Sequence, residues 1–119
     1  MIVQLESLGT TTVVLPEGRL DFGAAAAFEK QLTEALAGRG GVAPRTVILD
    51  GSGLEYVSSA GLRAILLAAR GAQRSGVAFS LCALKPAVRE VFDLSGFSRI
   101  IAVHPDRAAA LAAAPPSGP

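Results

Sequence analysis

The chain is poor in the side chains that most often carry catalysis or bind metals: its 119 residues include one histidine, His104, and one cysteine, Cys82. A single cysteine cannot form an internal disulfide, which favours a reducing compartment. No group of His, Cys, Asp and Glu has the spacing of metal ligands, and neither a P-loop nor a dinucleotide-binding fingerprint is present. We therefore predict a protein that is not an enzyme and that holds no metal or cofactor.

An excess of charge of one sign and a long hydrophobic run are also missing. Eleven Lys and Arg residues balance ten Asp and Glu residues, so the formal net charge is +1. This balance gives no reason to expect nucleic acid or an anionic membrane as a partner. No apolar run approaches the length that spans a bilayer, and no charged segment precedes an apolar stretch at the N-terminus. We expect a cytoplasmic protein.

Half of the residues are hydrophobic, which suffices for one core but leaves little chain for a second. No internal repeat and no linker divides the chain. The last residues are rich in Pro and favour disorder. We therefore predict one domain over residues 1–113 and a disordered tail over residues 114–119.

The segment from Arg45 to Arg70 is the most informative part of the chain. Residues 46–49 are β-branched and apolar, as is typical of a strand buried on both faces. Turn-forming residues and a short apolar bridge lead to Ser58 and Ser59. Apolar residues then recur at helical spacing. The sequence therefore predicts a strand, a loop and a helix whose first turn carries two serines.

Ser58 and Ser59 each have two candidate roles. A serine before a helix usually caps it by accepting a bond from a free backbone N–H group. A hydroxyl in this position is also exposed beside the positive end of the helix dipole, where an added phosphate is favoured. The two roles are compatible, because a capping hydroxyl can be modified. Asp21 is similarly either the cap of the first predicted helix or a neighbour of the serine loop.

The rest of the chain alternates between strand-like and helical patterns. Pro16, Glu17 and Gly18 are expected to end the second strand. The resulting order, β-β-α-β-α-β-α-β-α, predicts an α/β fold with a mixed sheet of about five strands and about four helices. The expected strands cover residues 2–5, 11–15, 46–49, 77–81 and 99–103, and the expected helices cover residues 23–37, 58–75, 86–95 and 105–113.

Three separated motifs give the chain a family resemblance. They are PEGRLD near the N-terminus, LDGSGLEYVSSAGLRAIL in the central segment and VREVFDLSGF downstream. In this order they resemble the STAS domain family, specifically the bacterial anti-sigma factor antagonists, from about Ile2 to Leu111. One departure is visible, since well-known members carry Asp where this chain has Ser58.

The resemblance implies a fold and a function. The STAS fold would place the helices on one face of the sheet and the antiparallel first strand at an edge. The phosphorylated serine of the family corresponds to Ser59, with Ser58 as the alternative. The implied partners are a serine kinase of the GHKL ATPase type, which is also an anti-sigma factor and is held until the serine is phosphorylated, and a serine phosphatase. The expected partner-binding residues are Asp21, Ser58, Ser59, Ala60, Gly61 and Arg63.

Two alternatives stay open at this point. Arg63 lies on the predicted helix one turn after Ser59, so it is either part of a solvated face or part of a docking surface. Some STAS proteins are accessory subunits or scaffolds, for example in lipid-transport ABC systems. In such a subunit the serines would only cap the helix, and phosphorylation would not control binding.

Overall fold

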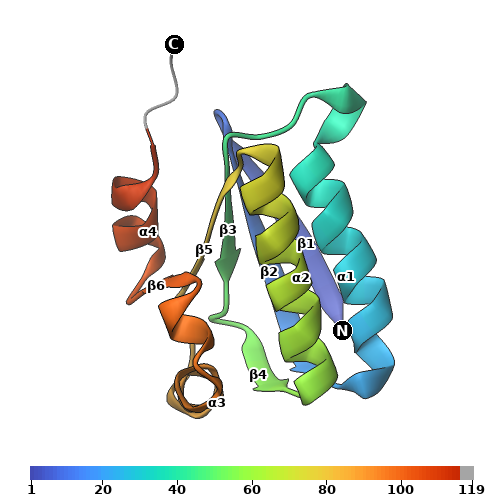
Figure 1. Ribbon diagram of the computed structural model, residues 1–119, viewed down its shortest axis with the longest axis vertical. Helices are drawn as coiled ribbons and strands as arrows, with labels where there is room; N and C mark the ends of the chain where they lie inside the picture. The colour runs from blue at the N-terminus through green and yellow to red at the C-terminus, as the bar shows by residue number, and fades with distance from the viewer. Residues whose placement is uncertain (116–119) are drawn as a thin grey trace.

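A mixed β-sheet organises the computed structural model, which describes residues 1–115 (Figure 1). The strand order is β1-β2-β3-β5-β6, and β4 pairs separately with the end of β2. β1 is antiparallel to β2, and the other neighbouring strands are parallel. The strands are β1 (Ile2–Leu8), β2 (Thr11–Leu20), β3 (Thr46–Asp50), β4 (Leu54–Val57), β5 (Ala78–Cys82) and β6 (Ala102–His104).

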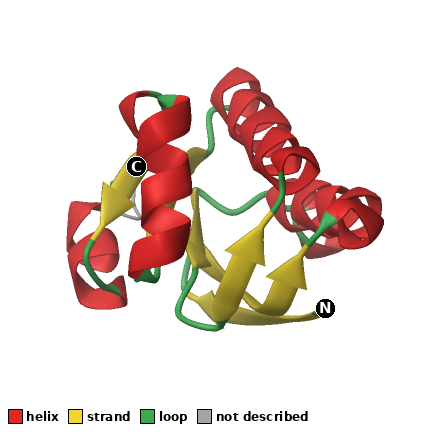
Figure 2. Ribbon diagram, turned by 90° about the horizontal axis from the view of Figure 1, so that it is seen from below, coloured by secondary structure: helices red, strands yellow, loops and turns green. Residues whose placement is uncertain are grey.

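Two long helices cover one face of this sheet. Figure 2 shows them side by side, and they are α1 (Phe22–Ala37) and α2 (Ser59–Ser75). Between them and the sheet lies the main core, to which β3 contributes Val47 and Leu49. The expected α/β fold and the antiparallel edge strand are confirmed.

The other face of the sheet also carries a helix, so the expectation that all helices share one face is wrong. The last helix, α4 (Arg107–Ala113), packs Ala110 against a smaller cluster with Val13, Ile48 and Cys82. The reason is the alternation of side chains along a strand, which turns Ile48 away from its neighbours Val47 and Leu49. A strand with apolar residues on both faces needs cover on both. The third helix, α3 (Pro86–Ser95), follows β5.

The second strand is longer than predicted, and a sixth strand was missed. β2 continues through Pro16 to Leu20, and β4 lies beside its last residues. β2 pairs with β3 only as far as Val14 and with β4 only from Gly18. Pro16 therefore lies between the two parallel ladders, where its missing N–H group interrupts neither of them.

The C-terminal elements differ slightly from the prediction. Instead of a strand at residues 99–103, a short 3-10 helix (Phe97–Arg99) precedes β6 at Ala102–His104. The last helix ends at Ala113, as expected. A disordered tail was predicted for residues 114–119. Four of these residues, 116–119, lie outside the described residues.

Candidate functional site

The ends of two paired parallel strands bring two helix starts together. Leu20, the last residue of β2, is paired with Val57, the last residue of β4. The next residue in each segment, Asp21 or Ser58, is the N-cap of the helix that follows. The backbone N–H of Ser58 donates to the carbonyl of Leu20 at 2.8 Å and so fixes the two segments to each other. We call Asp21–Phe22 and Ser58–Ser59 together the twin helix start.

Both caps use their side chains. The Asp21 carboxylate accepts a hydrogen bond from the backbone N–H of Ala24 at 3.0 Å, and the Ser58 hydroxyl accepts one from Gly61 at 3.1 Å. Each bond satisfies an N–H group that a helix leaves free at its start. The two roles considered for Asp21 are therefore both realised, since it caps α1 and lies beside the serine loop.

Ser58 and Ser59 have different surroundings. The Ser58 hydroxyl is half-buried and engaged in the cap, whereas Ser59 is the first residue of α2 and is exposed. Among the hydrogen bonds of residues 1–115, none involves the Ser59 hydroxyl. Sequence reasoning could not tell which serine caps the helix, and the structure assigns the cap to Ser58.

Gly61 lets α2 approach the strands closely. A Cβ atom at Gly61 would lie 2.6 Å from Cγ of Leu20 and 2.9 Å from its carbonyl oxygen. Both distances are shorter than real Cβ contacts, so a side chain here would push the helix start away from β2. Gly61 is buried and therefore acts by positioning the serine loop, whereas Ala60 is half-buried and Arg63 is exposed.

A shallow groove runs between α1 and α2 next to Ser59. Its floor consists of small side chains, and Glu29 and Arg63 bring opposite charges to it. Phe22, the first residue of α1, also lines the groove, and 84% of its surface is exposed. The complete lining is Phe22, Gly23, Ala25, Ala26, Glu29, Ala60, Arg63 and Ala64.

Phe22 was not among the predicted site residues, although the sequence contained a signal for it. The buried stripe of α1 includes Ala25, Phe28, Leu32 and Ala35. Phe22 lies in the first turn of α1, directly after the Asp21 cap and ahead of the large apolar residues Phe28 and Leu32 of this stripe. An aromatic residue directly after a cap and outside the stripe was therefore a candidate for an exposed contact residue.

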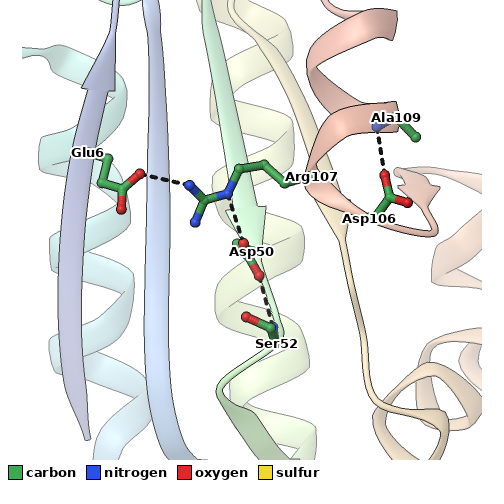
Figure 3. Close-up of polar contacts among 6 residues, drawn as sticks. All are labelled: Glu6, Asp50, Ser52, Asp106, Arg107 and Ala109. Atoms are coloured by element: carbon green, nitrogen blue, oxygen red, sulfur yellow. Dashed lines mark hydrogen bonds and ion pairs between the residues drawn. The ribbon is translucent and has the colours of Figure 1, made fainter.

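A buried carboxylate anchors the loop that leads to the serines (Figure 3). Asp50 ends β3 and is 5% exposed. One of its oxygens accepts from the backbone N–H of Ser52 at 3.0 Å, and the other accepts from Nε of Arg107 at 3.0 Å. Arg107 also donates to Glu6 of β1 at 2.8 Å. These bonds tie α4, β1 and β3 together beneath the loop.

The pKa of Asp50 reflects this environment. Burial alone would raise it, but the hydrogen bonds from Ser52 and Arg107 and the charge of Arg107 outweigh burial and lower the pKa below its ordinary value. Asp50 is therefore ionised at neutral pH. The paired charge makes it a structural carboxylate, since both of its oxygens are occupied by partners within the fold.

Cys82 lies close to Asp50 and is fully buried. Burial, together with the charge of Asp50, raises the pKa of the thiol to about 11. The thiol is therefore protonated at neutral pH, and Cys82 packs as a small hydrophobic residue.

The described residues contain neither a metal-binding cluster nor a membrane-spanning helix. Within residues 1–115, no group of three or more His, Cys, Asp or Glu side chains is arranged to hold a metal ion. In the same part of the chain, no helix is both long enough and apolar enough to cross a bilayer.

Comparison with known proteins gives a family and several relatives. Residues 3–110 match the model of the STAS domain. The chain is 46% identical over 84 residues to BtrV of Bordetella bronchiseptica, whose name assigns it provisionally to the anti-sigma factor antagonists; the match covers 71% of this chain and 72% of BtrV. An anti-sigma factor antagonist from Mycobacterium paratuberculosis shares the fold with a TM-score of 0.84, at 24% identity, over 95% of this chain and 92% of its own.

SpoIIAA of Bacillus, also an anti-sigma factor antagonist, has been solved in two forms. The unphosphorylated form superimposes with a TM-score of 0.74 at 26% identity, over 92% of this chain and 93% of its own. The phosphorylated form superimposes with a TM-score of 0.68 at 24% identity, over 93% of this chain and 97% of its own.

Proposed function

The chain belongs to the STAS domain family, and we propose that it is an anti-sigma factor antagonist whose binding is controlled by phosphorylation of Ser59. Unphosphorylated, it binds a cytoplasmic serine kinase of the GHKL ATPase type that also acts as an anti-sigma factor. Transfer of a phosphoryl group to Ser59 releases the kinase, and a serine phosphatase restores the binding form. The observation that carries this proposal is the exposed Ser59 hydroxyl, free beside a cap that Ser58 already provides.

Ser59 is a better phosphate acceptor than Ser58 for a geometric reason. Phosphorylation of Ser58 would disturb the oxygen that accepts from Gly61 and would weaken the cap. Removing an N-cap of this kind costs about 1 kcal/mol. Phosphorylation of Ser59 leaves the cap in place and adds negative charge at the positive end of the α2 dipole, where it is tolerated. The kinase can therefore modify Ser59 without unfolding the helix that presents it.

Release of the partner follows from the charge that phosphorylation adds. A phosphoserine carries about −1.5 to −2 charges at neutral pH and strong acceptor oxygens. A partner surface that covers the twin helix start in the unmodified complex would have to desolvate this charge or pair it. The favourable local energy at the helix start does not compensate for that cost at the interface, so the complex weakens while the fold is retained.

Phe22 and the groove extend the proposed contact surface beyond Ser59. A large side chain that is 84% exposed is an effective anchor when a partner buries it, because aromatic residues contribute much of the energy of protein interfaces. Arg63 follows Ser59 by four residues, so the two lie on neighbouring turns of α2. An apolar side chain of the kinase over the alanine floor, with an acidic group near Arg63, would fit this lining.

The test is a binding experiment with the kinase captured from the native cell. We expect Ser59→Ala to stay bound when ATP is present and Ser59→Asp to bind weakly. Wild-type protein should bind without ATP and be released as phosphate is transferred. Phe22→Ala should lower the affinity roughly tenfold or more, the loss of a single anchor residue.

The controls separate the site from the fold. Ser58→Ala should still be phosphorylated, with only a lower thermal stability. Leu94→Ala removes a side chain that is 81% exposed on α3 and should bind the kinase like wild type. If Ser59→Ala is modified as much as wild type, Ser58 is the acceptor. If wild-type protein binds a transporter ATPase independently of ATP and phosphate, the chain is an accessory subunit, and the proposal is wrong.

A further inference from the structure

The exposed apolar side chains of this protein are concentrated on the edge strand. Ile2, Leu5 and Leu8 of β1 are 62%, 44% and 45% exposed, and Met1 directly before the strand is 44% exposed. The other large exposed hydrophobic residues of the described chain are scattered over several elements. Because side chains alternate along a strand, Leu5 lies on one face of the sheet and Ile2 and Leu8 lie on the other. β1 therefore exposes apolar side chains on both faces, which makes it a candidate for association along its edge.

The backbone of β1 is also available for pairing. β1 lies at the end of the strand order and, within residues 1–115, pairs along all seven of its residues with β2 alone. Its outer edge therefore presents a row of unpaired N–H and C=O groups. Proteins normally protect such an edge with Lys, Pro or a bulge. β1 contains neither residue, its register with β2 is continuous, and its one charge, Glu6, is held by Arg107.

The hairpin geometry defines which groups face outward. Gly9 and Thr10 form a two-residue turn, and Leu8 and Thr11 are the pair that closes it. In such a hairpin the closing pair is hydrogen-bonded, and bonding alternates along the strands. The even-numbered residues of β1 therefore bond to β2. The N–H and C=O groups of Val3, Leu5 and Ser7 point away from the sheet.

We propose that β1 pairs with β1 of a second copy of the chain, antiparallel and about a two-fold axis at Leu5. Leu5 then faces Leu5 of the other copy in a hydrogen-bonded pair, and Val3 faces Ser7. Ile2 faces Leu8 on the other face of the sheet, and Gln4 lies opposite Glu6. This register uses every residue of the strand and sets no like charges against each other.

The neighbouring registers are less favourable, which makes the two-fold at Leu5 specific. A shift by two residues in one direction places Glu6 opposite Glu6 of the second copy. The shift in the other direction places Ile2 opposite Glu6. The first sets like charges against each other, and the second sets an apolar residue against a carboxylate. Shifts by one residue exchange the two faces and lose the outward-facing hydrogen bonds.

The pairing is compatible with the rest of the fold. α1 packs against β2, and the side chain of Leu5 on β1 is 44% exposed. Because the strands are antiparallel, the twin helix starts of the two copies lie at opposite ends of the joined sheet. Each copy can therefore meet its own kinase, and the pairing does not depend on the proposed phosphorylation.

The test is the mass of the protein in solution over a range of concentrations, measured by analytical ultracentrifugation. A single pair of seven-residue strands buries less than a standard interface, so the association should be weak and depend on concentration. We expect wild-type protein to dimerise at the highest concentrations and Leu5→Lys to remain monomeric, because two ammonium groups would meet at the axis. Ile100→Lys is the matched control at another exposed position and should dimerise like wild type.

A second measurement tests the register. Leu5→Cys should be linked rapidly into a covalent dimer by a short bifunctional maleimide, whereas Ile100→Cys should not. The native Cys82 is buried and does not compete. A wild-type monomer at every concentration, a Leu5→Lys dimer, or equal linking of both cysteine variants would overturn the proposal. Thermal unfolding of Leu5→Lys close to that of wild type establishes that the variant is folded.

Discussion

Single residues hold the twin helix start in position, and Gly61 shows this most clearly. Its backbone approaches Leu20 so closely that no side chain fits without movement. Ser58 is fixed to the same residue by a backbone hydrogen bond, so the loop has contacts on both sides of the serine pair. The position of Ser59 therefore depends on a glycine two residues further along the chain.

Gly61→Ala should destabilise the protein by about 1–3 kcal/mol, because the added methyl group overpacks the contact with Leu20. Gly71→Ala is the matched control within the same helix, since a Cβ atom there meets nothing within 4 Å. It should stabilise by about 0.5–1 kcal/mol through the better helix propensity of alanine. Urea unfolding of both variants measures the difference, and equal effects would contradict the role of Gly61.

At the scale of elements, the sequence predicted what has strong periodicity and missed what depends on neighbours. The helices beginning near Phe22 and Ser59 show clear apolar stripes, and both were predicted within a residue or two. β4 was missed because its four residues do not alternate: Leu54 and Val57 are buried, and the two between them are exposed. It is a strand because the end of β2 offers it a partner. No local pattern reveals such a partner.

The site was predictable to a similar extent. The motif around Ser59 and its position at a helix start could be read from the sequence. The choice of Ser58 as the cap required coordinates, because either serine could precede the first helical turn. The contact between Arg107 of α4 and Asp50, which anchors the serine loop, could not be predicted from the sequence either, since the two residues are 57 positions apart.

The bridge from Arg107 to Asp50 makes one element responsible for the acid stability of the fold. The pKa of Asp50 is lower in the folded state than in the unfolded state, where it is about 3.9. The ionised carboxylate therefore makes its full contribution to the free energy of unfolding above that unfolded-state pKa. This contribution is lost as the pH falls through the folded-state pKa. When the pH falls from neutral to below about 4, the free energy of unfolding of Asp50→Asn should therefore decrease less than that of wild type.

Arg107→Ala should lower the free energy of unfolding by about 1–3 kcal/mol at neutral pH, because it leaves a buried carboxylate without its partner.

Thermal unfolding of the three proteins across this pH range is the measurement. Glu6→Gln is the control, because it removes the exposed partner of Arg107 and leaves the buried bond intact. If the stability of Asp50→Asn depends on pH in the same way as that of wild type, Asp50 is not the source of the loss of stability in acid.

At the scale of the whole molecule, the sheet separates three surfaces. The parallel strand ends present the twin helix start, the edge strand presents its outer edge to the proposed second copy, and α4 covers the face opposite α1 and α2. A change at Ser59 can therefore alter one interface without disturbing the others. This separation suits a small binding module that is switched by one added charge.

The most direct test of the central claim is the position of phosphate on the protein isolated from its native cell. Intact-mass measurement with and without phosphatase treatment, followed by fragmentation, locates any phosphoryl group. We predict a fraction with one phosphoryl group, removed by phosphatase and mapped to Ser59. A protein without phosphate under every condition in which the sigma pathway is switched, or with phosphate on another residue, would contradict the account.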